Sequence, residues 1–499
     1  MNILLVYPKF PETFWSFTYA LPFIRKKSAF PPLGLLTVAA LLPENWTKRL
    51  VDENIEQIED EDLAWADMAF LGAMAIQRKS VVKIIARCKA MGVKVVAGGP
   101  LFTAEPDAFD QVDHLVLDEA ELTLPAFLAD LKNGRAKKTY NADGYPDIHA
   151  TPVPLWDLAP MHRYASLNIQ YSRGCPFNCE FCNITALFGR KPRTKTPQQI
   201  IAELDTIYQA GWRGNIFFVD DNFIGNKRSL KAHLLPALIK WREDKKGCVF
   251  FTEASINLAD DPELMTMMAA AGFDSVFIGI ETPEENSLAE CCKTHNQNRN
   301  LLQDVKKIHR SGLQVMGGFI VGFDNDPPSI FQRQIDFIQK SGIATAMVGL
   351  LQAPPGTRLF ERLAREHRVF TEFSGDNVDG RTNIIPAMGL DKLIDGYRGI
   401  MKQIYSPRQY YRRVRRILGE LKVPAARTPF DRQRILAFWR ACLRLGLLGK
   451  ERFQYWGLLA WTMAHKPRLL PLAVTLAIYG YHYRRICELH IFPARKPRF

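Results

Sequence analysis

Residues 171–182 read Tyr171-Ser172-Arg173-Gly174-Cys175-Pro176-Phe177-Asn178-Cys179-Glu180-Phe181-Cys182, which places three cysteines in a C-x3-C-x2-C pattern. Iron–sulfur clusters are ordinarily held by four cysteine thiolates. The three thiolates of this stretch therefore predict a [4Fe–4S] cluster with one iron left open for another ligand. An open coordination position is typical of a catalytic metal site, so we expect the chemistry of the chain to take place at this loop.

Two other interpretations of the three cysteines stay open. A structural zinc site normally has a fourth ligand, but no histidine lies close by and the next cysteine is Cys248. A chance grouping of free thiols is the second alternative. Phe181 packs either against the bound group or in the core. We interpret the remaining cysteines as free thiols, and they are Cys88, Cys248, Cys291, Cys292, Cys442 and Cys487.

Short apolar stretches alternate with helical stretches on both sides of the cysteine loop, over residues 161–384. Six strands at intervals of roughly 30 residues predict about six of the eight units of a TIM barrel. The cysteine loop follows the first strand, at the end where such barrels carry their chemistry. The expected strands are Leu167–Ser172, Asn215–Asp221, Val249–Ser255, Ser275–Glu281, Gln314–Gly322 and Ala344–Leu351.

The first 140 residues show a second alternation, which predicts a doubly wound, flavodoxin-like α/β domain with a parallel sheet. Residues 141–160 contain four prolines and no periodicity, so we expect a linker there. Residues 385–499 read as a helical, basic C-terminal extension. The expected strands of the first domain are Asn2–Pro8, Arg49–Glu53, Met68–Met74, Lys94–Gly99 and His114–Leu117.

The basic charge of the chain is concentrated in its tail. The 499 residues carry a net charge of +13, but the stretch from Tyr405 onward holds 20 Lys and Arg against 4 Asp and Glu. Any attraction to an anionic partner therefore concerns this tail. Its apolar runs are shorter than the ~20 residues that a spanning helix needs. With no visible signal peptide and no disulfide framework, we expect a cytoplasmic protein.

The cysteine pattern, with Phe181 before the last cysteine, resembles that of the radical S-adenosylmethionine (radical SAM) superfamily. The resemblance covers about residues 167–351. It implies that S-adenosylmethionine chelates the open iron and that its reductive cleavage gives a 5′-deoxyadenosyl radical. It also implies that later strand ends line the pocket for S-adenosylmethionine. The implied contacts are Asp220, Asp221, Asn222, Glu253, Ser255, Glu281, Gly318 and Gly322. Carboxylates at strand ends are alternatively helix caps, and strand glycines alternatively mark bulges.

The first domain resembles the cobalamin-binding domains that precede some radical SAM barrels. Supporting segments are Phe30–Leu35, Val95–Pro100 and Leu117–Glu121, the last resembling a "G-E-x-E" segment in which Asp118 stands where glycine is usual. Residues 1–113 lack a histidine, so we expect no histidine ligand below cobalt. A different nucleotide-like ligand, or none, is the alternative. The implied cobalamin contacts are Met74, Gln77, Gly98, Gly99, Pro100 and Glu119.

The whole arrangement resembles the subgroup that includes hopanoid C-2 methylases and bacteriochlorophyllide methylases. The run Leu187–Arg193 after the cysteine loop supports this resemblance. It implies a cobalamin-dependent methyltransferase that acts on an unactivated carbon of a hydrophobic lipid-like or tetrapyrrole-like molecule. It also implies a flavodoxin- or ferredoxin-type electron donor.

Two other functions remain open. One is a non-methylating cyclisation or rearrangement. The other is a corrinoid or cluster sensor whose tail binds nucleic acid, although the chain shows no recognisable DNA-reading module. The basic tail itself is expected either to rest on an anionic membrane or to form a helical cap over the barrel mouth.

Overall fold

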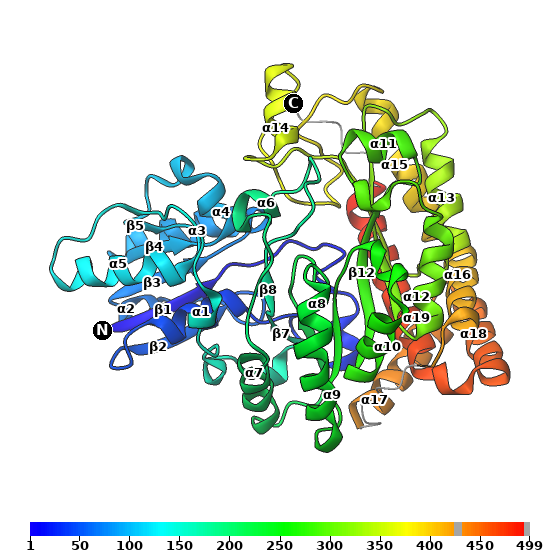
Figure 1. Cartoon of the computed structure of the whole chain (residues 1–499), viewed down its shortest axis with the longest axis horizontal. Coiled ribbons are helices and arrows are strands. Elements are labelled where there is room, and N and C mark those ends of the chain that lie inside the picture. Colours follow the sequence, from blue (N-terminus) through cyan, green and yellow to red (C-terminus); the bar gives the residue numbers. More distant parts are fainter. Residues whose placement is uncertain (424–431, 494–499) are drawn as a thin grey trace.

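The computed structural model describes residues 1–423 and 432–493, and it contains two parallel six-stranded sheets (Figure 1). The first sheet has the strand order β2-β1-β3-β4-β5-β6. Its strands are β1 (Asn2–Tyr7), β2 (Thr47–Asp52), β3 (Met68–Gly72), β4 (Lys94–Gly98), β5 (His114–Val116) and β6 (Thr139–Tyr140). The helices of this half are α1 (Leu33–Leu41), α2 (Asp60–Trp65), α3 (Arg78–Ala90), α4 (Pro100–Ala104) and α5 (Ala120–Lys132).

The first sheet confirms the doubly wound α/β fold. The four central residues of β1, 3–6, are all fully buried, because helices cover both faces of a parallel sheet. The five predicted strands are present within a few residues of their expected ends. The short edge strand β6 was not predicted, since two residues are too few for an alternating pattern. The stretch 141–160 contains two short 3₁₀ turns, Ile148–Ala150 and Trp156–Leu158.

The second sheet confirms the partial barrel. It has the order β14-β13-β12-β11-β10-β7, so β7 and β14 form its two edges. The strands are β7 (Ser166–Ile169), β10 (Asn215–Phe218), β11 (Val249–Glu253), β12 (Phe273–Glu281), β13 (Gln314–Val321) and β14 (Ala346–Leu350). The helices between and after them are α7 (Pro197–Gln209), α8 (Lys227–Ser229), α9 (Leu235–Asp244), α10 (Pro262–Ala271), α11 (Glu285–Glu290), α12 (Leu301–Ser311), α13 (Ile330–Ser341) and α14 (Arg358–Arg365).

A small hairpin carries the cysteine loop. Strands β8 (Ser172–Arg173) and β9 (Arg193–Thr194) pair antiparallel, and the cysteines and α6 (Ile184–Phe188) lie between them. Helix α7 begins directly after the hairpin at a capping box. The Thr196 hydroxyl accepts from the backbone amide of Gln199, and the Gln199 side-chain oxygen accepts from the backbone amide of Thr196. The cap fixes where the chain leaves the site and enters the outer helical layer.

The C-terminal helices pack along the barrel at the right of Figure 1. They are α15 (Leu390–Ile404), α16 (Pro407–Glu420), α17 (Arg432–Ala441), α18 (Arg452–His465) and α19 (Leu470–Ile486). The aromatic and arginine-rich run of the tail forms α16, and its Tyr410, Tyr411 and Arg413 are buried. Arg413 donates to the backbone carbonyl of Ile404 at 2.8 Å. This run is therefore packed into the body of the protein beside α12 and α13. Among the described helices, none is long and apolar enough to cross a membrane.

The segment after β1 reaches from the first sheet to the C-terminal helices, a contact that the sequence did not predict. The imidazole of His482 in α19 lies 3.1 Å from the carbonyl oxygen of Phe14 and accepts from the amide of Tyr19 at 3.3 Å. The Phe14 ring also packs edge-on against Tyr483. The segment after β1 is thus fixed to α19.

Candidate active site

The cysteine loop folds back on the segment after α6. Gly174 has a φ of 93°, and a Cβ at this position would lie within about 3 Å of the carbonyl oxygens of Phe188, Gly189 and Lys191. A side chain would therefore push the two segments apart. The Cys175 amide donates to the Gly189 carbonyl at 3.3 Å. The backbone presents Cys175, Cys179 and Cys182 along one loop.

The three thiols of the loop are the predicted cluster ligands. All three are free and half-buried. Burial raises the pKa of each, that of Cys182 to about 12; metal ligation replaces the proton and removes this penalty. Within the described residues, no three His, Cys, Asp or Glu side chains converge around one metal ion. A cluster does not need such convergence, because each thiolate binds its own iron.

Asp220, at the end of β10, supports the cysteine loop from behind. Its carboxylate accepts hydrogen bonds from the amides of Tyr171 and Ser172 and from the Ser172 hydroxyl. Burial raises its pKa to about 7 although these hydrogen bonds oppose the shift. Asp221 accepts from the Gly174 amide at 3.3 Å. Both carboxylates thus hold the loop, and their direct contact with S-adenosylmethionine stays a prediction.

The ends of β10 and β11 place predicted polar residues beside the first cysteine. The Asn222 amide lies 3.9 Å from the sulfur of Cys175 and donates to the Ser255 hydroxyl at 3.2 Å. Burial, and then the neighbouring carboxylates of Asp221 and Asp220, raise the pKa of Glu253 to about 8. The predicted residues of these two strands therefore lie together and form an acidic surface next to the cysteines.

A buried ion pair, which the sequence did not predict, lies beside the cysteine loop at the end of β12. Glu281, at the end of β12, has a φ of 62° and accepts from Lys293 at 2.7 Å. The Lys293 ammonium also lies 5.8 Å from the centre of the Phe181 ring. A Cβ at Gly279 would clash with both charged groups, at 2.2 and 2.8 Å. No motif marks Lys293, because it comes from a loop after α11.

The predicted glycines of β13 serve different purposes. Gly318 pairs with Gly279 of β12, and a Cβ there would meet the Phe277 ring at 3.0 Å. Gly322 ends the strand with a φ of 112°, and its amide donates to Asp326 at 2.8 Å. Both glycines allow close packing at the mouth of the barrel. Their contact with the adenine of S-adenosylmethionine stays a prediction.

The predicted cobalamin contacts gather at the carboxyl end of the first sheet. Gly99 has a φ of 90°, and a Cβ there would lie 3.3 Å from the carbonyl oxygen of Ala73. Pro100 then begins α4. Met74 is exposed, whereas Gln77 is buried and donates to the Pro8 carbonyl at 2.5 Å. The loops after β3 and β4 therefore form one surface, with Met74 available to a ligand and Gln77 bracing the backbone.

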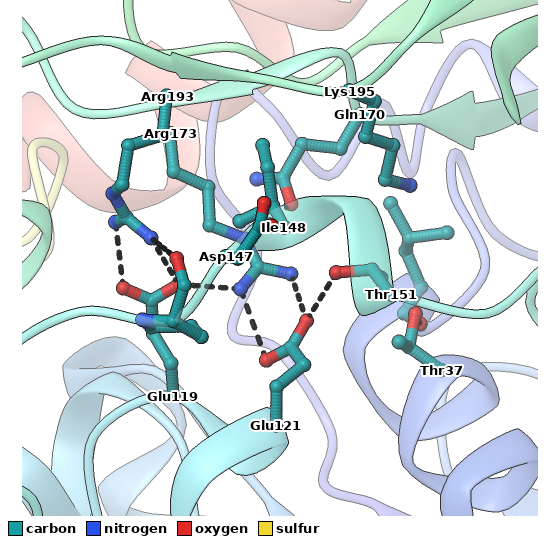
Figure 2. Close-up of polar contacts among 12 residues, drawn as sticks. Thr37, Glu119, Glu121, Asp147, Ile148, Thr151, Gln170, Arg173, Arg193 and Lys195 are labelled. Atoms are coloured by element: carbon teal, nitrogen blue, oxygen red, sulfur yellow. Dashed lines mark hydrogen bonds and ion pairs between the residues drawn. The ribbon is translucent and has the colours of Figure 1, made fainter.

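The loop after β5 is joined to the cysteine hairpin by a buried ion network (Figure 2). Arg193 donates to Glu119 at 2.6 Å, and Arg173 donates to Glu121 at 2.8 Å. Arg173 also bonds Glu119. Both oxygens of Glu119 are thus used by arginines, and its side chain is only 4% exposed. Its contact with cobalamin stays a prediction, but the structure shows that it links the loop after β5 to the cysteine hairpin.

Asp118 adopts a backbone conformation that glycine, the usual residue at this position, would favour. Its φ is 59°, in the left-handed region that glycine enters without strain and that Asp tolerates. The Asp118 carboxylate accepts from the amide of Ala142 at 3.0 Å. The departure from the "G-E-x-E" segment therefore preserves the turn that directs Glu119 and Glu121 toward the arginines.

Comparison with known proteins supports the geometry. The radical SAM superfamily profile matches residues 169–338, and a domain of unknown function, DUF4070, matches residues 357–492. An uncharacterized methyltransferase of Synechocystis sp. is 40% identical, over 98% of this chain and 92% of its own length. The hopanoid C-2 methylase of Rhodopseudomonas palustris is 36% identical, over 83% of this chain and 78% of its own. The chain belongs to the radical SAM methyltransferase family.

One solved structure shares the fold of the present chain across both sheets. The chain resembles OxsB, a cobalamin-dependent S-adenosylmethionine radical enzyme with aqua-cobalamin bound, with a TM-score of 0.64 and 15% identity over 98% of this chain and 80% of OxsB. The superfamily match spans Cys175, Cys179 and Cys182, and their role as cluster ligands stays a prediction. The match leaves the two arginines of the hairpin and Lys293 as site residues that motif spacing alone did not reveal.

Proposed function

We propose that this radical SAM methyltransferase uses cobalamin to methylate an unactivated carbon of a hydrophobic substrate. The observation that carries the proposal is the meeting of the carboxyl-end loops of both sheets. Glu119 and Glu121 of the first sheet bond Arg173 and Arg193 of the cysteine hairpin. Ligands of open α/β sheets bind at this end of the strands, so two cofactors bound in these places would face one shared space.

A second contact encloses the same space. A Cβ at Gly375, between α14 and α15, would lie 3.5 Å from the Cβ of Ala75 in the loop after β3. The Leu359 amide of α14 donates to the carbonyl of Glu180 between the cysteines at 3.1 Å. Helix α14 therefore contacts the cysteine loop, and the segment after α14 contacts the loop after β3. These two contacts support a common, covered space between the proposed cofactor sites, which we call the reaction chamber.

The residues of the chamber have separable roles in this proposal. The cysteines would hold the cluster and Asp220 would keep their loop in place. The acidic ends of β10 and β11 suit the cationic amine and sulfonium of S-adenosylmethionine, because neighbouring carboxylates stabilise positive charge. When bound, the cofactors supply radical formation and a transferable methyl group. The left-handed turn at Gly99 would let backbone approach the corrinoid closely.

The proposal further specifies that the substrate is hydrophobic. Its support is the 36% identity to a hopanoid C-2 methylase, and lipid-like or tetrapyrrole-like molecules share the required size and apolarity. Radical SAM enzymes need a reductant, and we propose a flavodoxin- or ferredoxin-type donor. Peripheral membrane contact belongs to the same proposal, since such substrates partition into bilayers.

An anaerobic assay of the reconstituted protein tests the reaction. Methylation predicts S-adenosylhomocysteine together with 5′-deoxyadenosine, and corrinoid absorption bands in the purified protein. Deoxyadenosine alone would favour cyclisation or rearrangement instead. Comparing lipid and pigment extracts with and without the gene identifies the substrate, because the product should be replaced by a species lighter by one methyl group. A protein that takes up no corrinoid contradicts the proposal.

A further inference from the structure

We propose that the helical hairpin formed by α17 and α18 docks on the surface of an anionic lipid bilayer. The hairpin comprises Arg432–Ala441, a π-helical turn at Cys442–Leu447 and Arg452–His465. It does not include the arginine-rich α16, which is packed into the body. The proposal concerns where the protein resides, so it does not rest on the methyl transfer.

The hairpin exposes large apolar side chains that soluble surfaces rarely gather in one place. Leu448 is 77% exposed, Phe453 75% and Trp439 64%. Leu443 and Leu447 are also more than half exposed. Single exposed apolar residues are ordinary, but a contiguous apolar patch marks an interaction surface.

Spacing places the exposed residues of each arm on a shared helix face. In the first arm, Trp439, Leu443 and Leu447 recur every four residues. In the second arm, Phe453 and Trp456 lie three apart, so they share a helix face. The indole of Trp456 donates to the carbonyl of Gly446 at 3.0 Å, which ties the two arms together near the tip. We call Trp439, Leu443, Leu447, Leu448, Phe453 and Trp456 the hairpin patch.

The opposite face of the hairpin holds it firmly to the body. Leu445, Tyr455 and Leu458 are fully buried. Arg440 donates to the carbonyl of Phe23 at 2.6 Å, so the N-terminal segment anchors the first arm. The outward apolar face is thus a fixed feature of a packed element.

The charges around the patch select an anionic partner. Between Arg432 and Arg468 the sequence has eight Lys and Arg and one acid, Glu451. Glu451 is buried and paired with Arg484, so it offers no exposed negative charge. Lys450 and Arg452 are exposed at the tip, and the Arg452 guanidinium lies 5.1 Å from the centre of the Phe453 ring.

An anionic bilayer is the occupant that this chemistry fits. Apolar and aromatic side chains beside Lys and Arg are the composition of helices that lie in a membrane interface. Each Lys or Arg near an anionic surface adds a favourable electrostatic contribution to binding. A second copy of the chain fits less well, because two such hairpins would bring their positive charges together. Figure 1 shows α17 and α18 away from α6, so docking would leave the mouth of the barrel free.

Flotation of the full-length protein with vesicles tests the proposal. We expect it to float with phosphatidylcholine vesicles that contain phosphatidylglycerol and to float much less with phosphatidylcholine alone. The variant Leu447→Ser/Leu448→Ser/Phe453→Ser should lose at least about tenfold in affinity, since burying even one such side chain is worth ~1.5 kcal/mol or more. Lys450→Glu/Arg452→Glu should lose binding in low salt.

A matched control is available on the first domain, where Val82 and Met91 of the α3 region are also exposed. Val82→Ser/Met91→Ser should float like the unchanged protein, and circular dichroism should show that every variant is folded. Equal flotation of the hairpin variant and the unchanged protein would overturn the proposal. So would failure of the unchanged protein to bind either vesicle. A hairpin variant that alters only the oligomeric state, measured by sedimentation, would show instead that a protein covers the patch.

Discussion

The guanidinium of Arg173 donates to the carboxylate of Glu121 at 2.8 Å and thereby joins the strand before Cys175 to the first turn of α5. Both side chains are at most 10% exposed. Burial alone would raise the pKa of Glu121, but the hydrogen bonds and charge of Arg173 outweigh it and lower that pKa. The position of the cysteine loop is thus coupled directly to the sheet proposed to bind cobalamin.

Replacing Arg173 should destabilise both the cysteine hairpin and the loop after β5. Arg173→Met leaves Glu119 with one arginine and Glu121 with none, and breaking a buried pair in this way costs about 3–5 kcal/mol. We expect a lower free energy of unfolding and less iron per chain, measured by denaturation and by metal analysis. Arg190→Met is the control, because Arg190 is exposed in the same loop region. An unchanged iron content in Arg173→Met would show that the network does not position the loop.

The coupling also has a predictable pH dependence. The lowered pKa of Glu121 means that its stabilising effect is present at neutral pH and is lost as pH falls through the folded-state value. The difference in unfolding free energy between the unchanged protein and Glu121→Gln should therefore be constant from about pH 6 to 8 and shrink on acidification below about pH 4. A difference that grows on acidification would contradict the ion pair.

Asp220 predicts the opposite slope. Its pKa is raised to about 7 by burial, so the folded state retains a proton that the unfolded state has lost. Stability relative to Asp220→Asn should decline as pH rises from about 4 to 7, at up to about 1.4 kcal/mol per pH unit, and then level off. Denaturant titrations across this range measure it. A flat difference would mean that Asp220 is ionised throughout.

Substitutions should distinguish the cysteines that bind the cluster from those that do not. Cys179→Ala should lose the cluster, measured by iron and sulfide content and by absorbance, because three thiolates are the minimum that the open-iron site uses. Cys291 is a stringent control: it is buried, and its carbonyl accepts from the amide of Glu180 at 2.9 Å. Cys291→Ala should keep the cluster. Loss of iron in both variants would mean that Cys291 is a fourth ligand.

Much of this arrangement could be predicted from local patterns. The strands follow from buried apolar runs, and the cysteine loop from a spacing that few other sites share. The Glu119 and Arg193 pair could not be predicted, because it joins residues 74 positions apart and depends on how two sheets meet. Lys293 was not predicted because no motif marks a residue in the loop after α11. Its partner Glu281 was expected at a strand end, but which cation neutralises it is decided by tertiary packing.

The C-terminal helices show a second limit of local patterns. The basic, aromatic tail was expected either to rest on an anionic membrane or to cap the barrel mouth. Arg413 and its aromatic neighbours are buried against neighbouring helices. An arginine of a helix can be buried when backbone carbonyl groups of neighbouring elements accept its hydrogen bonds. The spacing of residues in the sequence does not show where those carbonyl groups lie.

Gly99 provides a test of the proposed corrinoid surface. Its φ of 90° and the approach of the Ala73 carbonyl leave little room for a side chain, so Gly99→Ala should destabilise the fold by about 1–2 kcal/mol. It should also weaken binding of hydroxocobalamin, measured by absorbance titration at a temperature where the variant is folded. Gly399→Ala is the matched control, because Gly399 lies within α15 with open space around its Cα. That change should stabilise the helix by up to about 1 kcal/mol and leave corrinoid binding unchanged. Full corrinoid affinity in a folded Gly99→Ala protein would move the binding surface away from the turn after β4.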